Sequence, residues 1–150
     1  MRKIKSFSRN HDEIEPGLYL QEINRNVLVF DLRFIKPNTG AIPIEAMHTI
    51  EHLFATWLKI NCTDTEFRDV VISFNPGGCQ TMFYLEIFDD LSTTECDLAP
   101  ILIKCIDDCL KATEVPGSEK EECGNYKSHD LETAQYWLKK YKFILENEYV

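Results

Sequence analysis

Two histidines and a glutamate stand close together in the segment His48-Thr49-Ile50-Glu51-His52. If this segment is helical, residues four apart are neighbours on one face, so His48 and His52 can bind the same divalent metal ion. The Glu51 carboxylate can then exchange protons with a molecule that the metal holds. The pattern His-x-x-Glu-His therefore indicates a metal-dependent enzyme. The alternative is a solvated or hydrogen-bonded helix edge that binds no metal.

Two cysteines lie where their thiols can take part in chemistry. Cys123 lies in the polar connection Glu122-Cys123-Gly124-Asn125. A thiolate there would complete a His-His-Cys site whose fourth position is open to water or substrate. Cys79 follows Gly77-Gly78 between two predicted strands, where the backbone can turn sharply and expose a thiol. The alternative for Cys79 is a small buried residue in a tight hairpin.

The elements that must position these side chains follow from the hydrophobic periodicity. The sequence predicts strands over 17–23, 26–34, 69–75 and 82–88, and helices over about 43–61, over 94–111 and from Asp130 onward. Strands and helices occur in groups rather than in strict alternation, which favours an α+β fold with an antiparallel sheet packed against helices. The helices are expected to bury three apolar stripes: Met47, Ile50, Phe54, Trp57 and Leu58; Leu98, Leu102, Cys105, Ile106 and Cys109; Leu131, Ala134, Leu138, Tyr141 and Leu145.

Composition narrows the class of protein. A chain of 150 residues with 44% hydrophobic residues fits one globular domain spanning 1–150. Its net charge of −9 argues against nucleic-acid binding. No segment approaches the roughly 20 apolar residues of a membrane-spanning helix, and the charged residues 1–15 do not fit a secretion signal. Six cysteines without an export signal are expected to be free thiols in a reducing cytoplasm.

Several short motifs together resemble the S-ribosylhomocysteine lyase family, the bacterial enzymes that make the autoinducer-2 precursor. The motifs are Ser6-Phe7 with His11, Phe30-Asp31-Leu32-Arg33-Phe34 followed by Pro37-Asn38, His48 to Leu53, Gly78-Cys79-Gln80-Thr81, and Glu122-Cys123-Gly124 followed by His129-Asp130-Leu131. Each motif is weak alone. Their order and spacing cover nearly the whole chain and are highly specific together.

This resemblance implies a role for eight residues. It implies a site for a catalytic ferrous ion, which zinc or cobalt can replace, formed by His48, His52 and Cys123. It implies a general acid/base pair formed by Glu51 and Cys79. It implies substrate binding by Ser6, His11 and Arg33. It also implies a homodimer whose two active sites lie at the subunit interface.

The implied reaction fits the chemistry of these residues. A Lewis acid on the carbonyl and adjacent hydroxyl of S-ribosylhomocysteine makes the neighbouring C–H bond acidic. Glu51 and Cys79 can then move the carbonyl from C1 to C3, after which β-elimination from C5 gives homocysteine and 4,5-dihydroxy-2,3-pentanedione. Arg33 offers a fork of donors suited to the homocysteine carboxylate or the sugar hydroxyls. The alternative for Arg33 is an ion pair on the strand face with Asp31 or another acid.

Three departures from the family pattern leave two other functions open. The family usually has Asp where this chain has Ser73, Gly where it has Met82 and Asp where it has Asn10. Ser73 and Met82 flank the proposed catalytic cysteine, so a non-catalytic or weakly active metal-binding relative is one alternative. The other is an inverzincin-type metallopeptidase, in which Glu51 would activate a zinc-bound water and Glu121 or Glu122 would be the third ligand in place of Cys123. Such peptidases are much larger, multidomain proteins, and a chain of 150 residues is too short to form their enclosing chamber.

Overall fold

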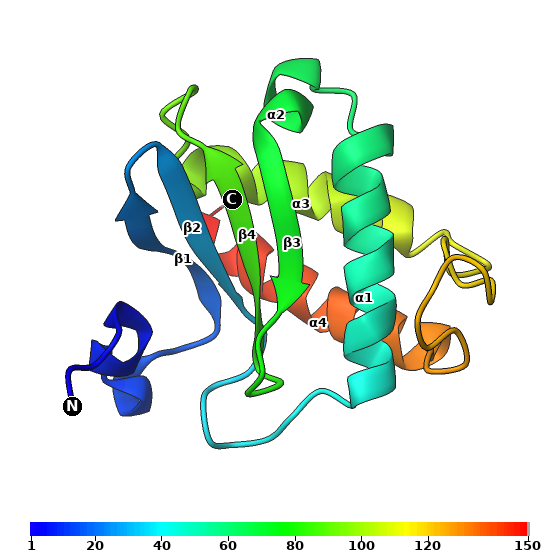
Figure 1. The fold of residues 1–150 in the computed structure, drawn as a ribbon, viewed down its shortest axis with the longest axis horizontal. Coiled ribbons are helices and arrows are strands. Elements are labelled where there is room, and N and C mark those ends of the chain that lie inside the picture. Colours follow the sequence, from blue (N-terminus) through cyan, green and yellow to red (C-terminus); the bar gives the residue numbers. More distant parts are fainter. Residues whose placement is uncertain (150) are drawn as a thin grey trace.

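A four-stranded antiparallel sheet forms the centre of the molecule in the computed structural model, which describes residues 1–149 (Figure 1). The strands are β1 (Gly17–Asn24), β2 (Val27–Arg33), β3 (Val71–Pro76) and β4 (Met82–Phe88), and their order in the sheet is β1-β2-β4-β3. β4 pairs with both β2 and β3. The chain therefore leaves the sheet after β2 and returns at its far edge, and the predicted α+β fold is confirmed.

Helices cover one face of this sheet. They are α1 (Ile44–Thr56), which continues into the wider π-helical turns of η3 (Trp57–Asn61), then α2 (Thr65–Val70), α3 (Glu95–Cys109) and α4 (Leu131–Tyr149). Two short 3-10 turns, η1 (Lys5–Ser8) and η2 (His11–Glu13), precede β1. In Figure 1, α3 and α4 run behind the sheet while α1 runs alongside β3. No helix within residues 1–149 is long and apolar enough to cross a membrane.

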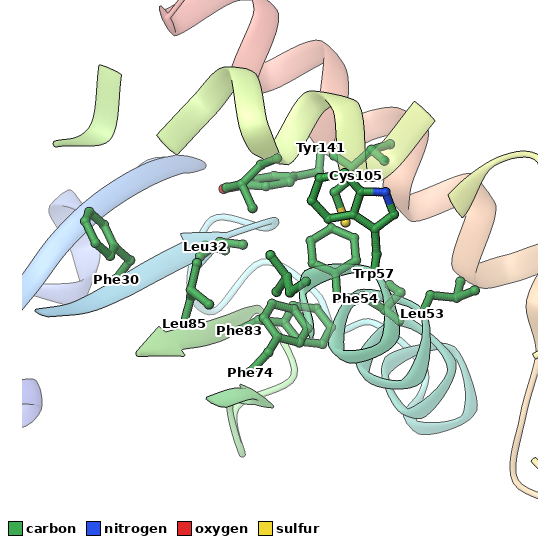
Figure 2. Close-up of a cluster of buried hydrophobic side chains, with 14 of the residues drawn as sticks. Phe30, Leu32, Leu53, Phe54, Trp57, Phe74, Phe83, Leu85, Cys105 and Tyr141 are labelled. Atoms are coloured by element: carbon green, nitrogen blue, oxygen red, sulfur yellow. The ribbon is translucent and has the colours of Figure 1, made fainter. Parts of the chain in front are cut away.

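The core lies between the sheet and the helices. Leu28, Phe30 and Leu32 of β2 are buried there, as the alternation along this strand predicts. Aromatic rings from α1 and the sheet meet in the centre, where the ring centroids of Phe54 and Phe74 are 4.8 Å apart (Figure 2). The three predicted helix stripes are buried, except that Leu131 is only partly covered.

The predicted start of the third strand is wrong, and the predicted start of the last helix is confirmed. The strand expected from residue 69 begins at Val71, because the short helix α2 occupies the residues before it. Asp64 caps the start of α2, because its side chain accepts a hydrogen bond from the backbone N–H of Phe67. The Phe67 side chain is buried in the core. Asp130 caps α4 as predicted, since its Oδ1 accepts from Thr133 N at 3.0 Å. This cap fixes the end of the connection that precedes α4.

Candidate functional site

Four side chains converge beside the first half of α1. His48 and His52 come from α1, and Cys123 and His129 come from the connection between α3 and α4. Cys123 Sγ lies 3.4 Å from His48 Nε2 and 3.9 Å from the Nε2 atoms of His52 and His129. In a tetrahedral site with metal–ligand distances of about 2.0–2.3 Å, the ligand atoms lie roughly 3.3–3.8 Å from one another. The four side chains can therefore bind a metal ion.

Backbone carbonyls determine which ring nitrogens of the helix histidines carry a proton. His48 Nδ1 lies 2.7 Å from the carbonyl oxygen of Ser128, and His52 Nδ1 lies 2.8 Å from that of Pro116. A carbonyl oxygen only accepts, so each Nδ1 must be the protonated donor. In the neutral ring each Nε2 then turns its lone pair toward Cys123, the orientation that metal-binding histidines take.

His129 is oriented in the same way through Thr49. The Thr49 hydroxyl donates its single proton to the carbonyl of Glu45 at 3.0 Å. It must therefore accept from His129 Nδ1, 3.1 Å away, which again leaves the lone pair on Nε2. Three imidazole lone pairs and one sulfur thus face one another with no proton donor from the rings between them. A cation relieves this repulsion, so the donor set fits a divalent metal.

The pKa of His129 is lowered to about 4, first because burial disfavours the charged ring and then because His48 and His52 lie nearby. His129 is therefore neutral at pH 7. In the unfolded chain its pKa returns to about 6.5, so unfolding takes up a proton between these two values. The stability present above about pH 6.5 is lost as pH falls toward 4.

In metal-free protein, the melting temperature of the parent is expected to fall more steeply than that of His129→Asn between about pH 6.5 and 4. Because His129 is partly exposed, we expect a difference of about 1–2 kcal/mol, or roughly 3–8 °C. Thermal melts in the presence of a chelator measure this difference, with each melting temperature expressed relative to that of the same protein at about pH 7.5. Parallel curves would show that the fold does not hold His129 neutral.

The connection before α4 reaches α1 through a glycine turn. Gly117 has a φ of +67°, which favours glycine, and a β-carbon there would lie 3.4 Å from His52 Nδ1. This turn follows Pro116, whose carbonyl holds the His52 ring. The backbone N–H of Cys123 then bonds to the carbonyl of Glu119 at 3.2 Å. The segment is therefore shaped to deliver a carbonyl and a thiol to the same helix.

Glu51 lines a hollow that His48 of the histidine–cysteine cluster also lines. The hollow has a volume of about 280 Å³ and is lined by Ile44, Met47, His48, Glu51, Pro76, Gly77, Gly78 and Gln80. Its wall thus combines the start of α1 with the turn between β3 and β4. A molecule in this hollow can contact Glu51 and His48 together.

Cys79 lines a second hollow, which shares no lining residue with the first. That hollow has a volume of about 150 Å³ and is lined by His11, Arg33, Pro37, Asn38, Gly40, Cys79 and Thr81. The Cys79 side chain is exposed, so the alternative of a small buried residue is wrong. Within one chain, the predicted acid/base residues Glu51 and Cys79 therefore line separate hollows.

Arg33 makes the ion pair considered as its alternative role and also lines the Cys79 hollow. Its Nη2 and Nε lie 2.7 and 3.2 Å from Oδ2 of the fully buried Asp31. Its Nη1 donates to the Thr81 hydroxyl at 2.9 Å. Arg33 is only 3% exposed, so most of its donors are already used within the chain.

Ser6 lies apart from both hollows. It lines a third depression of about 540 Å³ with residues of β1, β2 and β4, including Gln21, Val29, Tyr84 and Glu86. This depression lies on the sheet face opposite the helices, because Val29 alternates with the core residue Phe30. Of the predicted substrate-binding residues, the chain thus brings His11 and Arg33 to Cys79 but not Ser6.

The departures at Met82 and Asn10 are accommodated locally. Met82 is 1% exposed and its sulfur fills the space that a β-carbon at Gly77 would need, so its bulk lines neither hollow. The Asn10 side chain accepts from Asp12 N and caps the turn that carries His11, which an aspartate would also do. Ser73 is half-buried opposite Glu86 in the sheet, and nothing in the structure explains its substitution.

His129 is the site residue without a predicted role. It follows Cys123 by six residues and directly precedes the N-cap Asp130. The presence of a histidine close to a candidate ligand cysteine was the available signal. Its approach to α1 depends on the path of the whole connection, which local patterns do not determine.

Comparison with known proteins agrees with the geometry. The family model described as S-Ribosylhomocysteinase (LuxS) matches residues 4–148. An S-ribosylhomocysteine lyase of Borreliella burgdorferi is 40% identical over 154 aligned positions, covering 98% of this chain and 94% of the relative. A protein of the same name from Clostridium acetobutylicum is 37% identical, with the same coverage. A third, from Ligilactobacillus salivarius, is 36% identical and covers 93% of this chain and 90% of its own length.

Proposed function

This chain belongs to the S-ribosylhomocysteinase (LuxS) family, and from that premise we propose that it cleaves S-ribosylhomocysteine to homocysteine and 4,5-dihydroxy-2,3-pentanedione. The observation that carries this function is the convergence of three imidazoles and the Cys123 thiol beside Glu51. The reaction needs such a combination, because the C–S bond of the aldose is unactivated until its carbonyl moves. The whole chain then acts as one catalytic domain.

The proposed ligands of the catalytic ion are His48, His52 and Cys123, and the proposed ion is ferrous iron, with zinc or cobalt as substitutes. When bound, the ion supplies a Lewis acid for the sugar carbonyl and the adjacent hydroxyl. Three protein ligands leave a position open for substrate. The hollow lined by both His48 and Glu51 supports an approach from that side. His129, whose ring is neutral at pH 7, stands beside this set as a fourth donor.

Glu51 and Cys79 are the proposed proton carriers. Each shift of the carbonyl removes a proton from one sugar carbon and returns a proton to its neighbour. A carboxylate and a thiol on two sides of the sugar can perform both transfers. With the carbonyl at C3, removal of the C4 proton expels the homocysteine thiolate from C5. Within one chain the two groups line separate hollows, so both reach one sugar only where a partner chain brings its hollow to the first, as the proposed homodimer allows.

Substrate binding is proposed for Ser6, His11 and Arg33. His11 and Arg33 share the hollow of Cys79, which supports contacts with the part of the substrate nearest the thiol. Ser6 lines the separate depression on the open sheet face. This separation supports the proposed homodimer, in which a residue distant from its own active site can serve that of the partner.

The proposed location is the cytoplasm. All six cysteines are free thiols, two of them exposed. Exposed thiols persist in a reducing compartment and become oxidised outside it. Neither nucleic acid nor a membrane is a proposed partner, in line with the acidic composition.

Release of a free thiol from S-ribosylhomocysteine tests the proposed function. Protein reconstituted anaerobically with ferrous ion is expected to release homocysteine, and the chelated protein is expected to release none. Folded, metal-loaded protein that releases no thiol would favour a non-catalytic relative. Cleavage of an unfolded peptide instead would favour a metallopeptidase. Either result would overturn the lyase assignment.

A further inference from the structure

The hydroxyl of Thr81 stands between Arg33 and the sulfur of Cys79. Thr81 is 3% exposed, and its Oγ1 accepts from Arg33 Nη1 at 2.9 Å. The same oxygen lies 3.0 Å from Cys79 Sγ. Within residues 1–149 the Thr81 hydroxyl proton has no acceptor other than this sulfur. A buried hydroxyl left without an acceptor costs free energy, so the O–H group is expected to donate to Cys79.

Asp31 fixes the direction of the Arg33 guanidinium. Its Oδ2 accepts from Arg33 Nη2 at 2.7 Å and from Nε at 3.2 Å, so the guanidinium plane cannot rotate. Its Nη1 lies 2.9 Å from Thr81 Oγ1 and 3.9 Å from Cys79 Sγ. The chain of contacts therefore runs from Asp31 through Arg33 and Thr81 to Cys79.

The charges near this series of contacts favour a negative charge on the Cys79 sulfur. Arg9 Nη1 also bonds to Asp31 Oδ2, at 2.8 Å, so two guanidinium groups share one carboxylate. Two positive charges and one negative charge give this group one net positive charge, and its Arg33 Nη1 lies 3.9 Å from Cys79 Sγ. The pair formed by Lys36 and Glu15 is closed on itself and adds no net charge. A sulfur that accepts a hydrogen bond from a hydroxyl group close to a guanidinium is stabilised as a thiolate.

We propose that Thr81, oriented by the Arg33–Asp31 pair, is a positioning residue that holds the Cys79 sulfur as a hydrogen-bonded thiolate. The use of that thiolate in proton transfer rests on the proposed lyase function. The hydrogen bond does not depend on that function, so it can be tested without substrate.

Alkylation of Cys79 by iodoacetamide tests the proposal in the full-length protein. The matched variants are Thr81→Val, which removes the hydroxyl at nearly constant volume, and Thr81→Ser, which keeps it. The rate at Cys79 is read by peptide mass spectrometry relative to exposed Cys96, an internal reference in the same molecule. Loss of a hydrogen bond to a charged group changes the thiolate population roughly 10- to 100-fold, and the lower nucleophilicity of a stabilised thiolate offsets part of this effect.

Thr81→Val is expected to slow alkylation of Cys79 about tenfold relative to Cys96, with Thr81→Ser within about twofold of the parent. Equal rates in the parent and the valine variant would overturn the proposal. So would equal slowing by serine and valine, since the hydroxyl would then be irrelevant. Thr81→Ala carries the same test if the valine variant does not fold.

Turnover gives a second readout in metal-loaded protein. Thr81→Val is expected to lower kcat about tenfold with little change in KM, because the hydroxyl contacts Cys79 rather than the substrate. A raised KM with an unchanged kcat would contradict a role through the thiol. If the parent itself does not cleave S-ribosylhomocysteine, the proposed function fails while the alkylation result still decides the role of Thr81.

Discussion

Replacing Cys123 with alanine is expected to release the metal, whereas His129→Ala is expected to retain it. The proposed ligand set contains the thiolate of Cys123 and the two imidazoles of α1, and His129 lies beside it as an additional donor. Loss of outer contacts to a metal ligand alone weakens binding roughly 10- to 100-fold. Loss of a ligand is expected to exceed about 100-fold. Elemental analysis of the purified variants, followed by competition with a chromogenic chelator, measures both affinities.

Cys96→Ala is the matched control for the cysteine variant, because Cys96 is also a free cysteine but lies outside the cluster. It should bind metal like the parent. The informative alternative is the reverse pattern, in which Cys123→Ala retains stoichiometric metal and His129→Ala loses it. Three imidazoles would then form the site, and Cys123 would have to be removed from the proposed ligands.

Cys79→Ala and Glu51→Gln are each expected to retain metal and to lose turnover by roughly 10²–10⁴-fold, the usual contribution of a general acid or base. Both side chains line hollows without belonging to the donor cluster, so their loss should leave the metal site intact. The measurement is thiol release under saturating substrate, with the metal content of each sample determined in parallel.

Glu45→Gln is the matched control for Glu51→Gln, since Glu45 is an exposed carboxylate of the same helix. It should turn over at nearly the parent rate. A Cys79→Ala variant that turns over like the parent would remove the thiol from proton transfer. A Glu51→Gln variant that loses its metal would instead indicate that the Glu51 carboxylate supports the ligands.

Local sequence patterns predicted the elements well where one period dominated. The stripe from Met47 to Leu58 is buried as expected, although η3 widens its last turns. The sheet order was not predictable, because β4 inserts between β2 and β3 and this depends on contacts distant in sequence. Helix α2 was missed, since its six residues carry too little periodicity to distinguish a helix from the start of a strand.

In the site too, local sequence patterns predicted some features, while others depend on contacts between distant segments. The convergence of His48, His52 and Cys123 was predicted from residue type and spacing, and the structure brings them together. The approach of His129 and the separation of Glu51 from Cys79 depend on the paths of a long connection and of the β3–β4 turn. The Asp31–Arg33 ion pair was considered because the two residues share a strand face, yet the additional contact to Thr81 required the fold.

The contact between Met82 and Gly77 constrains how this chain can diverge from its relatives. The Met82 side chain already fills the space beside the Gly77 backbone, so the two positions are not independent. A lineage that acquires a side chain at position 77 while methionine stands at 82 passes through an overcrowded intermediate. The reverse order, in which residue 82 first becomes glycine, avoids it. Among homologues, bulk at these two positions is therefore expected to be exchanged rather than added, which makes the turn carrying Cys79 a site of epistasis.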